Sequence, residues 1–330
     1  MTEVEIGRSK RGRRAYAFDD VAVVPSRRTR DPEEVSTAWQ IDAYPFEIPV
    51  LAAPMDSVMS PSMAVALGRL GGLGVLDLEG VWTRYEEPEP LLAEIAELDG
   101  AAATKRLQEI YSAPIQEELI VRRIAEMREA GVTVAASLSP QRTAQLHKTV
   151  VEAGVDIFVI RGTTVSAEHV ASEREPLNLK KFIYELDVPV VVGGCATYQA
   201  ALHLMRSGAA GVLVGFGGGS AHTTASVLGI AVPMASAVAD VAAARRDYLD
   251  ESGGRYVHVI ADGGMTSTGD IPKAFALGAD AVIIGKLLAR ASEAPGRGWH
   301  WGSEAHHREL PRGERMHVGT TGPLEQILRG

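Results

Sequence analysis

One segment of the chain combines backbone freedom with polar side chains. It reads VGFGGGSAHTTA over residues 214–225. Its small residues are Gly215, Gly217, Gly218 and Gly219, followed by Ser220. Because glycine lets the backbone turn sharply and present its N–H groups, and a serine hydroxyl adds a donor, the segment is predicted to bind an anionic group such as a phosphate.

Two later segments place charged side chains in similar glycine-containing turns. IADGGM over residues 260–265 contains Asp262, and IIGK over residues 283–286 ends in Lys286. An ionised carboxylate only accepts hydrogen bonds, so Asp262 is predicted to hold a sugar diol, or else to serve as a turn or helix N-cap residue. Lys286 is either a point charge beside a bound phosphate or a solvated surface lysine.

Eight short apolar runs alternate with amphipathic stretches along the chain. Such runs are typical of buried parallel strands, and the stretches between them are typical of helices. The runs cover residues 50–53, 73–77, 132–136, 156–160, 188–192, 210–214, 257–261 and 281–284. Eight strand–helix units predict an α/β fold, a single-domain (β/α)8 TIM barrel, rather than an open sheet. In such a barrel the site lies at the C-terminal ends of the strands, where the three glycine-containing segments stand.

The regions outside this repeat complete the predicted organisation. Residues 1–47 are expected to form an N-terminal arm and strand, residues 48–293 the barrel, and residues 294–330 a C-terminal flap or tail. The Glu-, Pro- and Ala-rich segment 81–118 separates the second and third strands and is predicted as a loose helical connection on the surface. The tail is either a mobile flap over the site or a partly ordered extension.

Composition narrows the class of protein. The chain has 330 residues, 46% of them hydrophobic, a formal net charge of −9 and one cysteine, Cys195. A disulfide framework within the chain is excluded, and no secretory leader or long apolar run is recognisable, so a reduced cytoplasmic setting is expected without membrane contact. Basic residues are spread apart from two N-terminal runs, which argues against a nucleic-acid partner.

Six segments in order resemble landmarks of the IMP dehydrogenase/GMP reductase family. They are YAFDDVAVVPS (16–26), IPVLAAPMDSVMS (48–60), LGRLGGLGVL (67–76), VGFGGGSAHTT (214–224), VIADGGMTSTGDIPKAFALGADAVIIG (259–285) and APGRG (294–298). The resemblance implies an oxidoreductase of purine metabolism, in GMP biosynthesis, that binds IMP, XMP or GMP, uses NAD and assembles as a homotetramer. Relatives exchange hydride at purine C2 through an adduct with a cysteine on the loop after strand six.

The same resemblance assigns roles to positions of this chain. It places Ser220, Gly264, Gly285 and Lys286 at the phosphate, Asp262 at the ribose, Met55 at the base and Thr224 near the reacting carbon. It matches Gly217 and Gly219 to carbonyls that hold a monovalent cation, and Arg161, Gly162 and Thr163 to the region that meets the dinucleotide. The regulatory CBS pair of many members is absent, and segment 81–118 stands in its place.

The chain departs from the family pattern at the nucleophile. His222 occupies the position of the catalytic cysteine. A thiolate both attacks the carbon and leaves it readily, whereas imidazole is a weaker nucleophile there, so ordinary turnover is predicted to be severely reduced. Arg161 stands where dehydrogenases carry a carboxylate, and the flap reads WHWG over residues 299–302.

Two other features could be considered as substitutes for the catalytic cysteine: a second cysteine position and a metal site. Cys195 is expected to be a small buried hydrophobe, so that Cys195→Ala should leave any activity unchanged. A zinc site could be imagined from His222, His300, His306, His307 and Glu304. Because no tight ligand spacing connects His222 with the others, no metal site is predicted.

Competing functions remain open at this point. The first is an NAD-dependent oxidoreductase of the IMP dehydrogenase class, and the second is a non-catalytic purine-nucleotide-binding sensor or partner of an active paralogue. The family resemblance favours the first, whereas His222 and Arg161 favour the second. A GMP reductase is a weaker third reading because it needs the same thiol, and an unrelated phosphate-binding barrel is a fourth.

Overall fold

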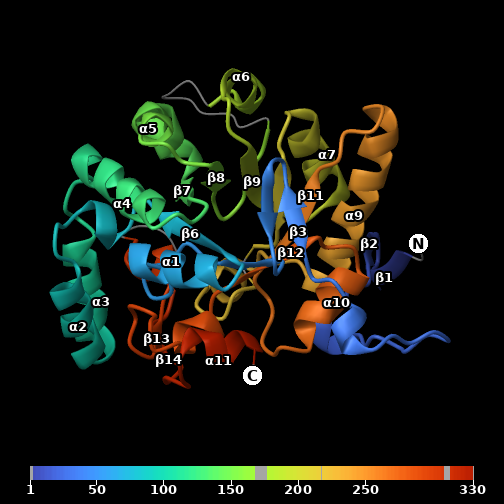
Figure 1. The fold of residues 1–330 in the computed structure, drawn as a ribbon. Helices are drawn as coiled ribbons and strands as arrows, with labels where there is room; N and C mark the ends of the chain where they lie inside the picture. The colour runs from blue at the N-terminus through green and yellow to red at the C-terminus, as the bar shows by residue number, and fades with distance from the viewer. Residues whose placement is uncertain (1–2, 168–176, 217, 308–312, 330) are drawn as a thin grey trace.

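Eight parallel strands close into a barrel at the centre of the molecule (Figure 1). The computed structural model describes residues 3–167, 177–216, 218–307 and 313–329. In chain order, and also in order around the barrel, the strands are β5 (Val50–Ala52), β6 (Leu73–Asp77), β7 (Ala135–Leu138), β8 (Ile157–Arg161), β9 (Val190–Cys195), β10 (Gly211–Val214), β11 (His258–Asp262) and β12 (Ala281–Ile284). This closed parallel sheet confirms the predicted (β/α)8 TIM barrel.

Helices surround the barrel on its outer side (Figure 1). They are α1 (Pro61–Arg69), α2 (Glu89–Glu97), α3 (Gly100–Ile110), α4 (Glu117–Glu129), α5 (Pro140–Glu152), α6 (Leu179–Glu185), α7 (Tyr198–Arg206), α8 (Thr224–Leu228), α9 (Met234–Glu251), α10 (Asp270–Ala276) and α11 (Leu324–Arg329). Local signals fix their starts: Ser60 accepts a hydrogen bond from the Met63 N–H, and Pro61 occupies the first turn of α1, as is common at helix N-termini.

The barrel strands are formed by the apolar runs, and their side chains are enclosed on both faces. Val75, Phe158 and Val192 are fully buried, as expected of parallel strands covered by helices. The third strand begins three residues later than the apolar run at residue 132 predicts. The Val134 N–H donates to the Asp156 carboxylate at 2.8 Å instead of to a neighbouring strand, although the Val134 carbonyl already accepts the N–H of Ile157 in β8 at 3.1 Å.

Segment 81–118 is not the loose connection that its composition predicts. Its helices α2 and α3 bury Leu92, Ile95, Leu107 and Ile110 almost completely. These residues recur at helical spacing and therefore form one apolar face on each helix. The segment is helical, as predicted, but it packs firmly against the body of the protein.

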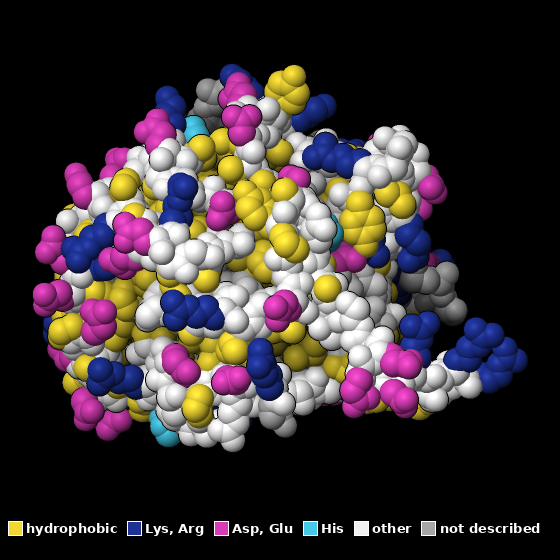
Figure 2. All heavy atoms as spheres, in the orientation of Figure 1, with side chains coloured by type: hydrophobic (Ala, Val, Ile, Leu, Met, Phe, Trp, Pro, Cys, Tyr) yellow, Lys and Arg dark blue, Asp and Glu magenta, His cyan; other side chains and the backbone are white. Residues whose placement is uncertain are grey.

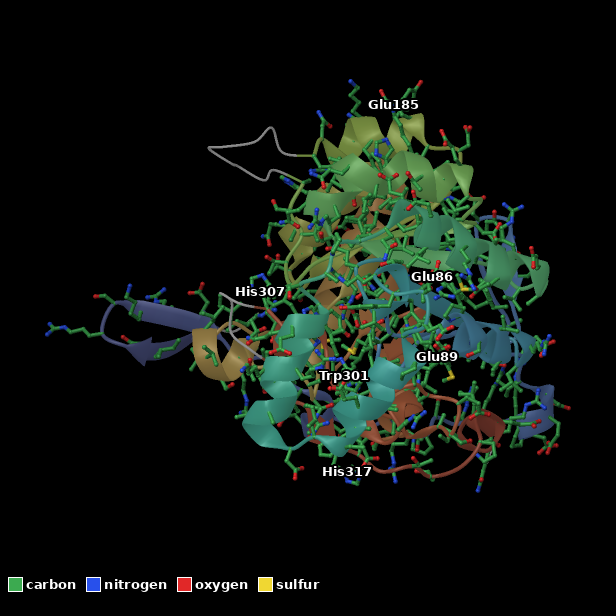
Figure 3. All side chains as sticks on the ribbon, turned by 90° about the vertical axis from the view of Figure 1, so that its left-hand side faces the viewer. Glu86, Glu89, Glu185, Trp301, His307 and His317 are labelled. Atoms are coloured by element: carbon green, nitrogen blue, oxygen red, sulfur yellow. The ribbon has the colours of Figure 1, made fainter. Side chains whose placement is uncertain are left out.

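Short antiparallel pairs of strands lie outside the barrel. β1 (Glu3–Gly7) and β2 (Lys10–Arg13) form an exposed hairpin that projects from the body (Figure 3). β3 (Trp39–Ile41) pairs with β4 (Tyr44–Phe46), and β13 (Trp299–His300) pairs with β14 (Met316–His317). The face drawn in Figure 2 intermingles acidic and basic side chains. None of the helices that the structure describes is long and apolar enough to cross a lipid bilayer.

Candidate active site

The loops at the C-terminal ends of the barrel strands converge on one pocket. Its cavity volume is about 120 Å³. The predicted site residues that line it are Met55, Arg161, Gly162, Thr163, Gly215, Gly219, Ser220, His222, Asp262, Gly264, Gly285 and Lys286. Thr224 is buried beside the pocket without lining it, and Gly217 lies outside the described residues. Residues far apart in the sequence are therefore brought together, while their individual roles stay predictions.

Two glycines of the predicted phosphate loops have little room for a side chain. Gly264 has a φ of +74°, and a Cβ there would lie 2.5 Å from Met234 Cγ. A Cβ on Gly285 would lie 3.2 Å from Cε1 of His300. Both positions keep the backbone close to the pocket, which suits loops that offer N–H groups to an anion.

His222 is held by the glycine-rich loop and by the segment after β12. A Cβ on Gly219 would lie 2.5 Å from His222 Cδ2, and the Gly219 carbonyl accepts the His222 N–H at 3.0 Å. On its other side, His222 Nδ1 lies 3.2 Å from Glu304 Oε1. The imidazole is thus fixed between the backbone of the glycine-rich loop and a carboxylate.

Glu304 binds three groups of the loop after β10. Besides His222, Thr224 Oγ1 donates to Oε1 at 2.6 Å and the Thr223 N–H donates to Oε2 at 3.0 Å. Burial alone raises the pKa of Glu304, but the hydrogen bonds from His222, Thr224 and Thr223 outweigh it and lower this pKa to about 2. A carboxylate that stays ionised orients the imidazole that contacts it, so the pair suits proton transfer.

His300 is a second imidazole in the pocket. Its Nδ1 lies 3.2 Å from Ser57 Oγ, and the same hydroxyl accepts the Trp301 N–H at 3.1 Å. Burial, with smaller contributions from the neighbouring His222 and Lys286, lowers the pKa of His300 to about 4. His300 therefore stays neutral at neutral pH and adds no charge to the pocket.

Asp262, predicted to hold a sugar diol or to serve as a turn or N-cap residue, pairs with an arginine across the pocket. Arg161 Nε donates to Asp262 Oδ2 at 3.1 Å. Burial lowers the pKa of Arg161, but the charge and hydrogen bond of Asp262 outweigh this and raise it. Asp262 ends β11 instead of capping a helix, and its predicted role at the ribose stays a prediction.

The thiol of Cys195 lies away from this chemistry. Cys195 ends β9, is only 2% exposed and does not line the pocket. Burial raises the pKa of its thiol to about 12. A protonated, enclosed thiol is unreactive, which agrees with the expectation that Cys195 does not replace the missing nucleophile.

The histidines of the flap do not gather around a common point. His306 stacks on Tyr111 with ring centroids 3.7 Å apart, and burial lowers its pKa to about 3. Within the described ranges, no group of three or more His, Cys, Asp or Glu side chains could hold a metal ion. The imagined zinc site therefore has no counterpart there.

A buried hydrogen-bond chain connects segment 81–118 to the flap. Tyr111 Oη donates to Asp56 Oδ2 at 2.5 Å and lies 3.3 Å from Trp301 Nε1, which donates to it. Figure 3 shows Trp301 beside helices α2 and α3. Burial raises the pKa of Asp56 to about 6, although the bonds from Tyr111 and Val81 oppose the rise. Asp56 directly follows Met55, which lines the pocket. The hydrogen bonds that hold Asp56 therefore also fix this edge of the pocket.

Sequence reasoning missed the partners that complete the site. Glu304 and His300 were considered only as metal ligands, and Tyr111 not at all. The position of Glu304 after the eighth strand, two residues beyond Gly302, was a usable signal because active-site loops leave the barrel there. For Tyr111 the sequence holds no such signal, since its contact with Asp56 spans 55 positions.

The residues after β8 do not suit the dinucleotide that the family resemblance implies. A carboxylate usually accepts the hydrogen bond of a dinucleotide ribose, and Arg161, Gly162 and Thr163 supply none. The guanidinium of Arg161 is also engaged with Asp262. NAD therefore takes no part in the function that we propose for this pocket. The carbonyl of Gly219, which the resemblance matches to a monovalent cation, accepts the backbone N–H of His222 at 3.0 Å.

Comparisons with known proteins agree with the fold. The model of the IMP dehydrogenase / GMP reductase domain matches residues 15–308. An uncharacterized oxidoreductase of Mycolicibacterium smegmatis is 54% identical over 99% of this chain and 89% of its own. An inosine-5'-monophosphate dehydrogenase of Methanocaldococcus jannaschii is 29% identical over 86% of this chain and 74% of its own.

A solved structure extends this likeness to three dimensions. The IMP dehydrogenase/GMP reductase-like protein of Corynebacterium glutamicum superposes with a TM-score of 0.94 at 48% identity, covering 99% of this chain and 87% of that chain. The chain belongs to the IMP dehydrogenase/GMP reductase family. Its relatives with the highest identities among those named here carry the description of oxidoreductases.

Proposed function

We propose that the pocket binds a purine nucleoside 5'-monophosphate, namely IMP, XMP or GMP. The phosphate lies among the loops after β10, β11 and β12, near Ser220, Gly264 and Gly285, with the charge of Lys286 beside it. The observation that carries this proposal is the convergence of these three loops on one pocket. Loops after the last strands of such barrels commonly hold phosphate.

The base lies between Met55 and His222, where the family places the reacting carbon. Both residues line the pocket on the side of Gly302, whose Cβ would lie 3.3 Å from His222 Cε1 and 3.4 Å from Met55 Cε. The space is narrow there. A nucleotide pocket normally measures about 300 Å³ or more, so segment 300–304 shifts when the base enters.

The thiol-dependent step of the family does not take place in this protein. The chain has one cysteine, and that residue is buried outside the pocket. His222 is held by Glu304 for proton transfer rather than for a reversible bond to carbon. The protein therefore acts as a purine-nucleotide-binding member of an oxidoreductase family, in the role of a sensor or a partner of an active paralogue.

Calorimetric titration with IMP, XMP and GMP tests the binding. Wild type is expected to bind at least one of them, and Lys286→Ala to weaken that binding about ten- to a hundredfold, because a hydrogen bond to a charged group contributes about 1.5–3 kcal/mol. Lys148→Ala on the exposed face of α5 is the matched control and should bind like wild type. If no purine monophosphate binds, the proposal is wrong.

Turnover is tested separately by following NADH formation from IMP and NAD. We expect none above background in wild type or in Cys195→Ala. Steady-state NADH formation that His222→Ala abolishes would contradict the claim that the thiol step has been lost.

A further inference from the structure

A second cavity lies apart from the candidate active site. Its volume is about 620 Å³. Helix α6 forms one wall, and the end of α7 with the turn after it forms another; both helices lie in the upper part of Figure 1. Gly208 in this turn precedes β10 and Arg255 precedes β11. This part of the cavity therefore lies where barrel strands begin, whereas the candidate active site lies where they end.

The charge that faces this cavity is positive. Glu251 pairs with Arg206 through both of its oxygens, at 2.8 and 2.6 Å, and Glu185 Oε1 lies 3.9 Å from Lys181 Nζ. Neither carboxylate lines the cavity. Among the residues that the structure describes, the charged side chains that line it are Lys180, Lys181, Arg206 and Arg255. A protein with a formal net charge of −9 thus presents only basic side chains here.

Arg255 is held at the edge of the cavity by the backbone. Its Nη2 donates to the carbonyl of Gly208, which leaves further N–H donors of the guanidinium for a ligand. Gly208 has a φ of +101°, and a Cβ there would lie 3.4 Å from Ile183 Cγ2 and 3.7 Å from Arg255 Nη2. Because glycine adds no side chain at this point, the space between α6 and Arg255 stays open.

These features suit a compact anion that carries several charges. A single phosphate reaches only part of a cavity with basic side chains on both walls, whereas a chain of phosphates reaches across it. Hydrogen bonds from Lys and Arg to phosphate are charge-assisted and therefore strong. The volume falls within the range of about 300–1,000 Å³ that is usual for small-molecule sites. Tyr184 also lines the cavity and is 90% exposed, so its ring is available to stack on a base.

We propose that this cavity binds an oligophosphate, either free or as the phosphate chain of a nucleoside triphosphate. Lys180 and Lys181 hold the phosphates from one wall, and Arg206 and Arg255 hold them from the other. Tyr184 contacts the base when the ligand carries one. This site is separate from the pocket that binds the proposed nucleoside monophosphate, and its existence does not depend on that function.

Calorimetric titration with inorganic tripolyphosphate at low ionic strength, where charges are least screened, tests the site. Wild type is expected to bind. The double variant Lys180→Ala/Lys181→Ala should bind about tenfold or more weakly, because two charged donors are lost. Its matched control, Arg142→Ala/Lys148→Ala, removes two exposed basic side chains from α5 and should stay within about twofold of wild type.

Two further variants keep the test decisive. Arg255→Met changes the other wall and should weaken binding about threefold or more, even if the double variant does not fold. Lys286→Ala, at the candidate active site, should bind tripolyphosphate like wild type. The proposal would be overturned by the absence of binding up to millimolar concentrations, or by binding that Lys286→Ala abolishes and the variants at the second cavity leave unchanged.

The source of the oligophosphate is distinguished by comparing ATP with tripolyphosphate in the Lys286→Ala background, which weakens binding at the candidate active site. If ATP binds about fivefold or more tightly than tripolyphosphate and Tyr184→Ala removes this preference, the ligand is a nucleotide whose base stacks on Tyr184. Equal binding of both compounds identifies a free oligophosphate. Either result supports the site, whereas ATP binding that survives Lys180→Ala/Lys181→Ala unchanged would overturn it.

Discussion

At the scale of single residues, one carboxylate organises the candidate site. Glu304 accepts hydrogen bonds from Thr224 and Thr223 and pairs with His222. The family's nucleophile position thus contacts the flap, with His222 Nδ1 3.2 Å from Glu304 Oε1, rather than being left free to attack. This pairing explains why histidine at position 222 is compatible with a well-ordered pocket that lacks the thiol.

Glu304→Gln should lower the free energy of unfolding by about 1–3 kcal/mol near neutral pH, because three hydrogen bonds to a charged, buried acceptor are weakened. The pKa of Glu304 is lowered to about 2 in the folded protein. Its stabilising effect is therefore present above the usual carboxyl range and is lost as the pH falls from about 4.5 toward 2. Urea denaturation of both proteins at several pH values measures this difference.

The matched control is Glu325→Gln. Glu325 forms an exposed pair with Arg329 one helical turn away, and such pairs contribute less than about 1 kcal/mol. A loss in Glu304→Gln no larger than in this control would show that Glu304 does not hold the site together.

At the scale of elements, segment 81–118 does more than connect two strands. Helix α3 ends next to Tyr111, whose hydroxyl lies between Asp56 and the Trp301 indole. The flap residue His306 stacks on the same ring. The segment therefore holds the flap through Tyr111, and we expect entry of the proposed nucleotide to require these contacts to open.

Tyr111→Phe should speed nucleotide association by about threefold or more. The substitution keeps the ring but leaves the Trp301 N–H and the Asp56 carboxylate without their shared partner, an effect of about 1–3 kcal/mol that favours the open flap. Stopped-flow tryptophan fluorescence with the nucleotide that binds best gives the rate. Tyr198→Phe, which removes a comparable hydroxyl–carboxylate contact with Asp247 on the surface, should associate like wild type. Equal rates in all three proteins would refute the fastening.

At the scale of the whole molecule, buried neutral imidazoles make stability depend on pH. The pKa of His306 falls from about 6.5 to about 3 on folding. Below pH 6.5, His306 is protonated in the unfolded chain but stays neutral in the folded protein. The free energy of unfolding therefore decreases as the pH falls. The substitution His306→Gln removes this pH dependence of the stability.

The test compares how much the free energy of unfolding falls between two pH values in wild type and in His306→Gln. From about pH 7 to about pH 5, wild type should lose about 1–2 kcal/mol more stability than His306→Gln, because each pKa unit corresponds to about 1.4 kcal/mol. Buried acids such as Asp56, whose pKa is raised, act in the opposite direction in both proteins and cancel in the comparison. Parallel pH profiles would contradict the burial of a neutral His306.

The barrel and the pocket loops were predictable because their signals are local. Apolar runs such as 73–77 specify strands by themselves, and glycine-rich turns such as 214–225 specify where a backbone can approach a ligand. The pairing of Arg161 with Asp262 and the packing of segment 81–118 were not predictable, since each depends on which distant side chains the closed barrel brings into contact. The composition of segment 81–118 suggested a loose connection because composition does not show which face of a helix packs against the rest of the protein.

The central claim is that a purine mononucleotide lies in this pocket with its phosphate among the three glycine-containing loops. A crystal structure of the protein with IMP is the most direct test. The account predicts phosphate oxygens within hydrogen-bond distance of Ser220 and the backbone at Gly264 and Gly285, the base between Met55 and His222, and no covalent bond to the protein. A phosphate bound elsewhere, or a bond between purine C2 and His222, would contradict it.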